Sequence, residues 1–233
     1  MTNAFDEPEG IHPRGTVVVA AGRGETIDAY QRFGRRIASD GYRVRLLPDV
    51  TTDPAASFTE AEKLLVDDGS PAPRVLVGAD TGALFALTLA ARSTPGLDGL
   101  VLAGLPVARP TGISLLDWDA ELEARTGCPA HRGVLSRGAV TPGALTSAQI
   151  PTEFIGTIGD VNLPTLGLHG DADLVSPLDQ AQPAYPGALT VITGGRHDVL
   201  NDLSHRTVAA TVVVFLERLR LGADAPAVAR TVR

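Results

Sequence analysis

The chain has 233 residues, of which 44% are hydrophobic and 20% are charged. This length and composition are typical of one compact globular domain rather than of two domains or a disordered chain. The formal net charge is -7 and the sequence contains no basic stripe, so neither nucleic-acid binding nor membrane binding is expected.

Targeting, metal and redox signals are few. Residues 1–15 contain no apolar run, and no later apolar run reaches the length of about 18 residues that a membrane span needs. A cytoplasmic protein is therefore expected, and the scarcity of lysine beside many Arg, Ala and Gly residues is typical of a high-GC bacterium. The single cysteine, Cys128, has no partner for a disulfide, and no Cys/His cluster predicts a metal site. We expect no cofactor, while the oligomeric state cannot be predicted.

Six short aliphatic or β-branched runs predict strands that are buried on both faces of a sheet. They are residues 15–21, 42–48, 74–79, 99–105, 164–170 and 188–194. Longer segments with helical spacing lie between several of these runs, as in a parallel sheet with helical crossovers. The pattern predicts an α/β fold with about six strands and helices on both faces.

Three segments predict helices that pack on this sheet. Residues 26–40 carry one apolar stripe, and residues 81–92 are apolar nearly all round, as expected for a helix buried behind an active-site strand. The last predicted helix spans residues 201–221. It begins at the N-cap residue Asn201 and directs Leu203 and three later apolar residues toward the sheet.

A long insertion separates the fourth predicted strand from the fifth. It spans residues 108–161, and residues 115–127 within it predict an amphipathic helix with an acidic face. Long segments of this kind inside a compact domain commonly form lids or binding elements. We therefore expect one domain, residues 1–233, with a small cap formed by the insertion, in which Trp118 and His131 are candidate substrate-binding residues.

The segment Gly78-Ala79-Asp80-Thr81-Gly82 lies directly after a predicted strand and directly before a predicted helix. A sharp turn of this kind needs small residues on both sides of a central residue, whose side chain then projects above the sheet. The helix N-terminus favours a negative charge and so keeps the Asp80 carboxylate ionised. Aspartate is also a common N-cap, so the segment by itself fits a helix start without catalysis.

Two later loops hold an acid and a histidine. The loop of residues 169–177 follows the fifth predicted strand, and Asp173 is the acid that we expect to orient a histidine, with Asp171 as the second choice. An acidic turn would also explain this loop. His197 follows the last predicted strand. The chain order Asp80, Asp173, His197 is the order of nucleophile, acid and histidine in α/β-hydrolases.

The chain resembles the α/β-hydrolase superfamily in four segments. AAGRGET, VGADTGA, LHGDADLVSP and GGRHDVLND resemble the oxyanion loop, nucleophile elbow, acid loop and histidine loop of that superfamily. The resemblance covers residues 15–219 and lacks the first two strands of larger members. It implies that the backbone N–H groups of Arg23 and Thr81 form an oxyanion hole. The Arg23 side chain is expected in solvent, with pairing to Glu25 or Asp80 as alternatives.

An aspartate at the elbow changes the chemistry that the triad can perform. An ionised carboxylate is nucleophilic without a base, but its attack on an ester would give a high-energy anhydride. Attack on an sp³ carbon that bears a halide, or on an epoxide, gives an alkyl ester, which His197 and Asp173 could hydrolyse. The elbow resembles those of haloalkane dehalogenases and soluble epoxide hydrolases, which also carry aspartate.

This chain departs from both groups beyond Asp80. Dehalogenases of this kind commonly have a halide-binding tryptophan where Thr81 stands, and epoxide hydrolases generally have two cap tyrosines that protonate the epoxide. None of the three tyrosines lies in the predicted cap. His131, Glu121 and Glu123 remain as candidate acids, although each is expected at the surface.

Three functions therefore stay open from the sequence. The first is hydrolysis of an epoxide or another activated alkyl carbon of a small-molecule substrate. The second is a non-hydrolytic biosynthetic reaction, for instance in secondary metabolism, in which Asp80 and His197 act as general acid and base for epoxide opening, cyclisation or isomerisation. The third is a catalytically inactive ligand-binding protein. Asp80 could also replace a native serine, in which case Asp80→Ser would restore an esterase.

Overall fold

A seven-stranded sheet forms the centre of the computed structural model, which describes residues 3–107, 117–155 and 161–222. The strand order is β1-β3-β2-β4-β5-β6-β7, and all neighbours pair in parallel except β1, which pairs antiparallel with β3. The strands are β1 (Ala4–Phe5), β2 (Thr16–Ala21), β3 (Arg43–Asp49), β4 (Arg74–Ala79), β5 (Gly99–Ala103), β6 (Thr165–Gly170) and β7 (Ala188–Ile192). This arrangement confirms the predicted α/β class. The sequence does not predict β1, because two residues carry no periodicity.

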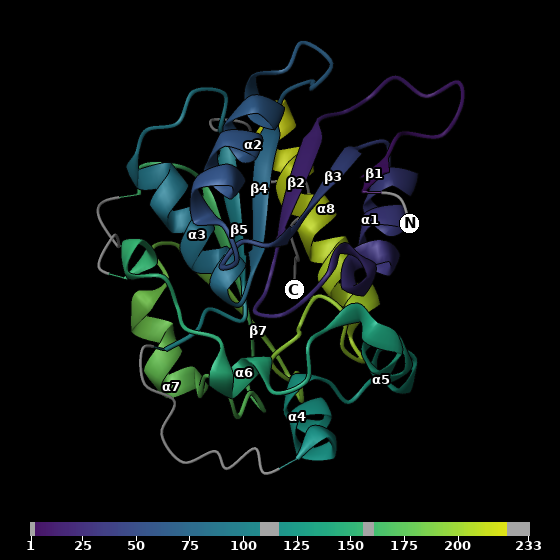
Figure 1. Cartoon of the computed structure of the whole chain (residues 1–233). Coiled ribbons are helices and arrows are strands. Elements are labelled where there is room, and N and C mark those ends of the chain that lie inside the picture. Colours follow the sequence, from purple (N-terminus) through teal and green to yellow (C-terminus); the bar gives the residue numbers. More distant parts are fainter. Residues whose placement is uncertain (1–2, 108–116, 156–160, 223–233) are drawn as a thin grey trace, which may run out of the picture.

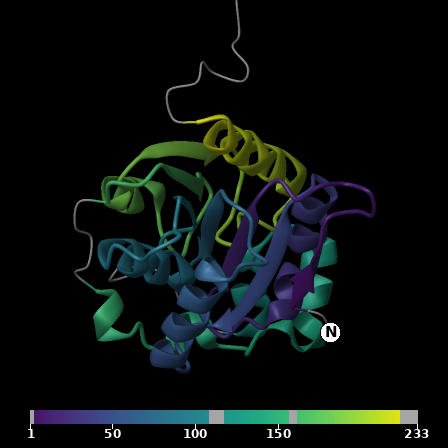
Figure 2. The same cartoon turned by 90° about the horizontal axis from the view of Figure 1, so that it is seen from above.

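Helices cover both faces of the sheet (Figure 1). They include η1 (Ile27–Tyr30), α1 (Gln31–Ser39), α2 (Pro54–Val66), α3 (Thr81–Ala91), α7 (Leu178–Ala181), η4 (Gln182–Ala184) and α8 (His205–Leu221). Figure 2 shows α8 on one side of the sheet and α2 and α3 on the other. Alternate residues of β2 reach the two cores, with Val17 and Val19 on the α1/α8 side and Val18 on the α2/α3 side. The sheet is therefore buried on both faces, as its apolar strands require.

Two helices differ from the sequence expectation. Helix α2 is not among the predicted helices, although Asp53 caps its first turn and Pro54 follows at a position that favours helix starts. Helix α8 begins at His205 instead of Asn201, because the Asp202 carboxylate accepts hydrogen bonds from the backbone N–H groups of Gly127 and Arg196 and holds a turn there. Leu203 therefore does not face the sheet, and 64% of its surface is exposed.

The segment between β5 and β6 carries short helices, most of which lie at the carboxyl edge of the sheet near the lower edge of Figure 1, while the last of them packs against α2 and α3. They are α4 (Trp118–Arg125), α5 (Pro129–Val134), the π-helix η2 (Leu135–Ala139), α6 (Ala144–Ser147) and the 3-10 helix η3 (Thr152–Phe154). Helix α4 matches the predicted amphipathic helix, with Asp117 as its N-cap. Residues 108–116 and 156–160 of the predicted cap lie outside the described residues. No helix in the described ranges is long and apolar enough to cross a membrane.

Glycines on both sides of Asp80 allow the turn from β4 into α3. A Cβ added to Gly78 would lie 2.1 Å from the carbonyl oxygen of Gly82, and one added to Gly82 would lie 2.2 Å from the carbonyl oxygen of Ala20. Both obstructing atoms belong to the backbone, so neither can move aside as the end of a side chain can. The close packing of strand on helix thus explains the small residues that flank Asp80 in the sequence.

Replacing Gly82 with alanine is expected to lower the free energy of unfolding by about 1–3 kcal/mol or more, because the new methyl group overlaps β2. Urea denaturation monitored by circular dichroism measures this change. Gly133→Ala is the matched control, since a Cβ there meets only the end of the Arg137 side chain at 3.2 Å. Equal stability of the two variants would contradict the packing argument.

Candidate active site

Asp80 lies at the turn where β4 passes into α3. Its φ of 48° and ψ of -120° are unusual for a residue with a side chain, and Ser93 is the other non-glycine residue with positive φ in the described ranges. The Asp80 backbone N–H donates a hydrogen bond to the Ala103 carbonyl at 3.0 Å, which anchors the turn to the end of β5. The side chain is held in a strained and buried position, as at a nucleophile elbow.

The three residues predicted as a triad lie together at the carboxyl edge of the sheet. His197 Nδ1 is 2.8 Å from Asp173 Oδ2, and His197 Nε2 is 3.2 Å from Asp80 Oδ1. All three side chains are at most 5% exposed. The contact with Asp80 is close enough for an ion pair but is not aligned as a hydrogen bond, so Nε2 keeps a proton that it can direct elsewhere.

Backbone hydrogen bonds fix the orientation of Asp173. Its Oδ1 accepts from the N–H groups of Val175 at 2.8 Å and Ser176 at 2.9 Å, which leaves Oδ2 for His197. Asp171, the second choice for this role, is exposed and accepts a hydrogen bond from Gly194 N–H, so it stabilises a turn away from the histidine. The geometry therefore supports Asp173 as the residue that orients His197.

A second buried histidine, which the sequence analysis did not single out, supports the acid loop. His169 Nε2 lies 2.7 Å from the Ser176 carbonyl oxygen, so Nε2 carries the proton. Its Nδ1 then accepts from the Tyr185 hydroxyl at 2.8 Å, and that hydroxyl accepts from Leu105 N–H at 2.9 Å. Burial lowers the pKa of His169 despite Asp173 nearby, so this histidine is neutral. The chain of hydrogen bonds joins the ends of β5 and β6 to the loop that carries Asp173.

The Arg23 side chain is buried against Asp80, which corrects the expectation that it lies in solvent. Its Nε lies 2.8 Å from Asp80 Oδ2, its Nη2 lies 2.8 Å from Oδ1, and the residue is 4% exposed. Its Nη1 also donates to the Leu145 carbonyl at 3.2 Å. Pairing with Asp80 is one of the two alternatives that the sequence leaves for this side chain, although no spacing favours it over solvent, since the two residues are 57 positions apart. The ion pair formed is bidentate, the strongest arrangement of these two groups.

Neighbouring charges shift the pKa values of both Asp80 and His197. Burial alone would raise the pKa of Asp80, but the Arg23 guanidinium and His197 hold it well below its usual value, so the carboxylate is ionised. Burial likewise opposes the charged form of His197, but Asp173 and Asp80 outweigh it and raise the pKa to about 10. At neutral pH the resting site therefore holds an imidazolium between two carboxylates.

This imidazolium predicts a pH dependence of stability. Because the pKa of His197 is raised to about 10 in the folded state, its charge stabilises the fold fully below about pH 6.5, and that contribution is lost as the pH rises through the folded value. The free energy of unfolding should fall between about pH 8 and 10 by up to about 1.4 kcal/mol per unit. His197→Gln should flatten this part of the curve in urea titrations, and parallel curves for both proteins would contradict the prediction.

The predicted oxyanion hole is supported on one side. The backbone N–H of Arg23 donates to Asp80 Oδ2 at 3.0 Å, the position where charge would develop when water attacks an alkyl ester of Asp80. Thr81 begins α3 and is fully buried, and its hydroxyl has no hydrogen-bond partner among the described residues. Thr81 Oγ1 and His197 Nε2 are thus two buried polar atoms beside Asp80 that a substrate group could satisfy.

Two of the remaining candidate residues, Glu121 and His131, belong to a buried ion cluster that the sequence analysis missed. At its centre, Arg125 is fully buried and contacts Glu25 at 3.0 Å, Glu121 at 3.1 Å and Asp198 at 3.6 Å. Its Nη2 also donates to the Arg23 carbonyl at 3.1 Å. Helix α4 is therefore fixed to the oxyanion loop and to the residue after His197.

Two of the three candidate acids are not at the surface, contrary to expectation. Glu121 is 2% exposed within the ion cluster, and His131 is 3% exposed and lies 3.3 Å from Asp198. Glu123 is exposed, as expected, and pairs with arginines at the surface. Trp118 is half-buried against the larger hydrophobic core, so its role in substrate binding stays a prediction.

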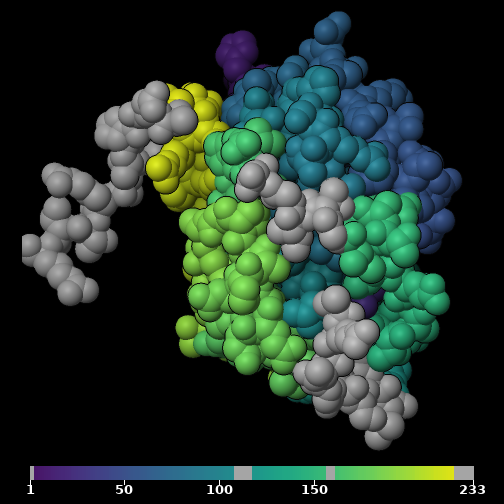
Figure 3. All heavy atoms as spheres, turned by 90° about the vertical axis from the view of Figure 1, so that its left-hand side faces the viewer, coloured from purple at the N-terminus to yellow at the C-terminus, as the bar shows by residue number. Residues whose placement is uncertain are grey.

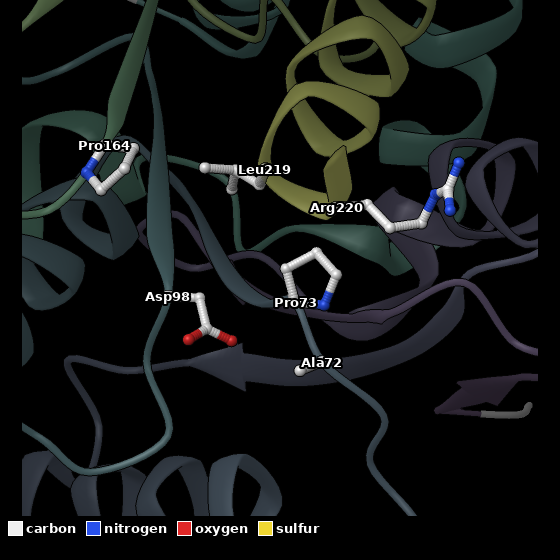
Figure 4. A pocket seen from close by; sticks show the side chains of 6 residues that line it. All are labelled: Ala72, Pro73, Asp98, Pro164, Leu219 and Arg220. Carbon is white, nitrogen blue, oxygen red and sulfur yellow. The ribbon is translucent and has the colours of Figure 1, made fainter. Parts of the chain in front are cut away.

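Other parts of the described chain offer no better centre. In residues 3–107, 117–155 and 161–222, no group of three or more His, Cys, Asp or Glu side chains is arranged so that it could hold a metal ion. Figure 4 shows a pocket of about 370 Å³, but its lining residues directly precede β4, β5 and β6 or end α8. It lies at the amino ends of the strands, whereas ligands in parallel α/β sheets bind at the carboxyl ends. Its two charged residues, Asp98 and Arg220, already have partners.

Comparisons with solved structures show what this architecture is similar to. A monoacylglycerol lipase of Paleococcus ferrophilus matches with a TM-score of 0.72 and 15% identity, over 94% of this chain and 97% of the lipase. A meta-cleavage product hydrolase of Pseudomonas fluorescens, a mutant complexed with acetates, matches with a TM-score of 0.66 and 17% identity, over 92% and 93% of the two chains. A monoglyceride lipase of Saccharomyces cerevisiae matches with a TM-score of 0.65 and 15% identity, over 93% of this chain and 90% of the lipase. No family model and no curated protein sequence matches. Likeness at these identities shows a shared fold.

Proposed function

We propose that this chain, which has the α/β-hydrolase fold, is an enzyme that hydrolyses an epoxide or another activated alkyl carbon through an ester on Asp80. One observation carries the proposal. Asp80 projects from a strained elbow with Oδ2 on the Arg23 backbone N–H and Oδ1 3.2 Å from His197 Nε2. One carboxylate oxygen is thus stabilised by an oxyanion donor while the other faces the acid–base residue.

The first step forms the alkyl ester. Asp80 Oδ1 attacks the epoxide carbon, a C–O bond forms, and the ring C–O bond breaks with its electron pair on oxygen. The imidazolium of His197 gives its Nε2 proton to that oxygen, so the products are a hydroxyalkyl ester and a neutral histidine. The raised pKa of His197 supports this step, because the histidine is protonated before substrate reacts. No cap tyrosine is needed as the acid.

The second step regenerates the site. Esterification removes the charge of Asp80, so one of the two carboxylates that hold the His197 proton is lost and the imidazole becomes a base. Neutral His197, oriented by Asp173, takes a proton from water as that water attacks the ester carbonyl. The tetrahedral intermediate expels the alkoxide, which takes the proton of the newly formed acid. The diol leaves, and Asp80 carboxylate and His197 imidazolium are restored.

Single turnover in ¹⁸O-water tests the proposal. The enzyme in excess is mixed with 2,3-epoxypropanoate or styrene oxide, and the peptide that contains Asp80 is weighed by mass spectrometry. We expect ¹⁸O in the Asp80 carboxylate, because water attacks the ester carbonyl. With an epoxide, His197→Gln should lose both label and turnover, because it lacks the acid of the first step and the base of the second. With 2-chloropropanoate, whose chloride leaves without a proton, the same variant should accumulate the alkylated peptide, since the ester forms but is not hydrolysed. Turnover without label in Asp80 would reject the ester.

A second candidate function is acid–base chemistry without hydrolysis. The state of His197 favours it, because its raised pKa keeps the imidazole protonated at neutral pH and its Nε2 has no hydrogen-bond partner among the described residues. His197 would then act as the acid and Asp80 as the base in opening, cyclisation or isomerisation of a substrate. Product isomers that contain no solvent oxygen, formed while Asp80 stays unlabelled, would establish this reaction.

A further inference from the structure

Arg23 contacts most of the hydrogen-bond acceptor positions of the Asp80 carboxylate. The guanidinium contacts both carboxylate oxygens, and the backbone N–H of the same residue contacts Oδ2 again. A carboxylate offers about four acceptor positions, so Arg23 occupies three of them and His197 lies against the fourth. Any reaction at Asp80 gains from the departure of the guanidinium.

The cost of that departure depends on what replaces Asp80. Arg23 is 4% exposed, and a neutral substrate that displaced it from Asp80 would leave a buried cation without a partner. A substrate that carries its own carboxylate would exchange one carboxylate for another in the same guanidinium fork, so no buried charge is left unpaired. The exchange would free Asp80 as a nucleophile at the moment when substrate is bound.

We propose that Arg23 is the recognition residue for an anionic substrate, and that a carboxylate on the substrate replaces Asp80 as its partner. This inference deepens the proposed function and rests on it for the subsequent chemistry. Since the guanidinium nitrogens lie 2.8 Å from the Asp80 oxygens, the electrophilic carbon must be one or two bonds from the anionic group. The substrate class is therefore small acids with an epoxide or leaving group beside the carboxylate.

Contacts of Arg23 with the segment above the site agree with this exchange. Nη1 donates to the carbonyl of Leu145 on α6, and Leu145 packs with Ala124 and Val175 in a small cluster separate from the two large cores. Movement of the guanidinium toward a substrate would break its hydrogen bond to α6. Figure 3 shows a hollow in the surface between the α7 segment and the segment of α6 and η3.

Binding of unreactive probes tests the inference without catalysis. Isothermal titration with propanoate and with propanamide compares two molecules of nearly equal shape that differ in charge. We expect wild type to bind propanoate and Arg23→Gln to bind it about tenfold to hundredfold more weakly, the usual contribution of hydrogen bonds to a charged group. Wild type should bind propanamide no more tightly than Arg23→Gln binds propanoate. Arg206→Gln, which removes an exposed arginine of α8, is the control and should bind like wild type.

Asp80→Asn gives a signature that a structural role of Arg23 would not produce. Because Asp80 competes with the probe for the guanidinium, its removal should tighten propanoate binding by about tenfold or more. The ¹⁵N chemical shift of Arg23 Nε in wild type, which needs no variant to fold, should also change on addition of propanoate and not of propanamide. Equal binding of both probes, or propanoate binding that is indifferent to Arg23→Gln, would overturn the inference.

The two proposals can fail separately. If propanoate binding depends on Arg23 while Asp80 acquires no ¹⁸O from 2,3-epoxypropanoate, the anion site stands and the ester mechanism fails. If 2,3-epoxypropanamide labels Asp80 as fast as 2,3-epoxypropanoate, the ester mechanism stands and the substrate class is wrong. The inference expects the carboxylate to react at least about tenfold faster than the amide, and this preference to vanish in Arg23→Gln.

Discussion

Asp80→Asn is expected to lower kcat by about 10⁴-fold or more and to abolish the covalent intermediate. The amide has nearly the same shape as the carboxylate, but it carries no charge and cannot attack an alkyl carbon. The stopped-flow rate with 2,3-epoxypropanoate and the mass of the intact protein after mixing measure the two effects. His197→Gln should also lose kcat with the epoxide, because it lacks the acid of the first step, but its mass should rise after mixing with 2-chloropropanoate, whose chloride leaves without a proton.

The control for Asp80→Asn is Asp171→Asn, because that carboxylate is exposed and its contact with Gly194 N–H survives as an amide. Its rate should stay within about twofold of wild type, since surface substitutions away from the site have small effects. Asp80→Ala is a second variant, because the asparagine of Asp80→Asn can deamidate slowly and so regenerate aspartate. An Asp80→Ala enzyme that keeps a tenth of the wild-type rate would exclude Asp80 as the nucleophile.

Arg125→Met should lower the free energy of unfolding by about 3–5 kcal/mol, the largest stability effect expected in the chain. Arg125 is fully buried, and its removal leaves Glu121 and Asp198 as buried acids without their shared cation. Burial and Asp198 already raise the pKa of Glu25 to about 8, against the effect of Arg125. The loss of Arg125 therefore also removes the group that favours the charged form of Glu25.

Urea denaturation at pH 7 measures the change, and Arg132→Met is the matched control. Arg132 pairs with Glu123 at the surface, where ion pairs contribute about 0–1 kcal/mol, and donates one hydrogen bond to the Thr126 carbonyl, which contributes about 1 kcal/mol, so its replacement should cost less than that of Arg125. The double variant Arg125→Met with Glu121→Gln should recover part of the loss, because one unpaired charge is gone. A stability loss in Arg125→Met no greater than that in Arg132→Met would contradict the central place of Arg125 in the cluster.

Much of the fold could be predicted because its signals are local in the sequence. The six longer strands coincide with nearly continuous apolar runs in the sequence. The glycines on both sides of Asp80 indicate a close turn from strand to helix, and the backbone atoms that a Cβ would meet there explain why these residues are small. The start of α8 could not be placed, because Asn201 looks like an N-cap while Asp202 uses distant N–H groups of Gly127 and Arg196. Tertiary contacts decide between these two alternatives.

For the candidate site, the sequence predicts the three triad residues but not the burial of the arginines beside them. Asp80, Asp173 and His197 follow from chain order, since each stands just after a strand whose carboxyl end lies at the same edge. The Asp80 partner of Arg23 was an alternative that the sequence could not favour over solvent, and the partners of Arg125 do not follow at all, because charged residues are normally at the surface. Chain order thus brings together the three candidate reacting groups, whereas the buried cations beside them emerge only from three-dimensional packing.

The ion pair between Arg23 and Asp80 also bears on how such a site could arise or be reversed. A serine at position 80 would offer no charge to the buried guanidinium, so the two positions can change only together or through an intermediate that is penalised. Asp80→Ser alone is therefore not a return to an esterase, and a working serine enzyme would need a neutral residue at position 23 as well. Positions 23 and 80 should therefore be replaced together, and not one at a time, when this site changes.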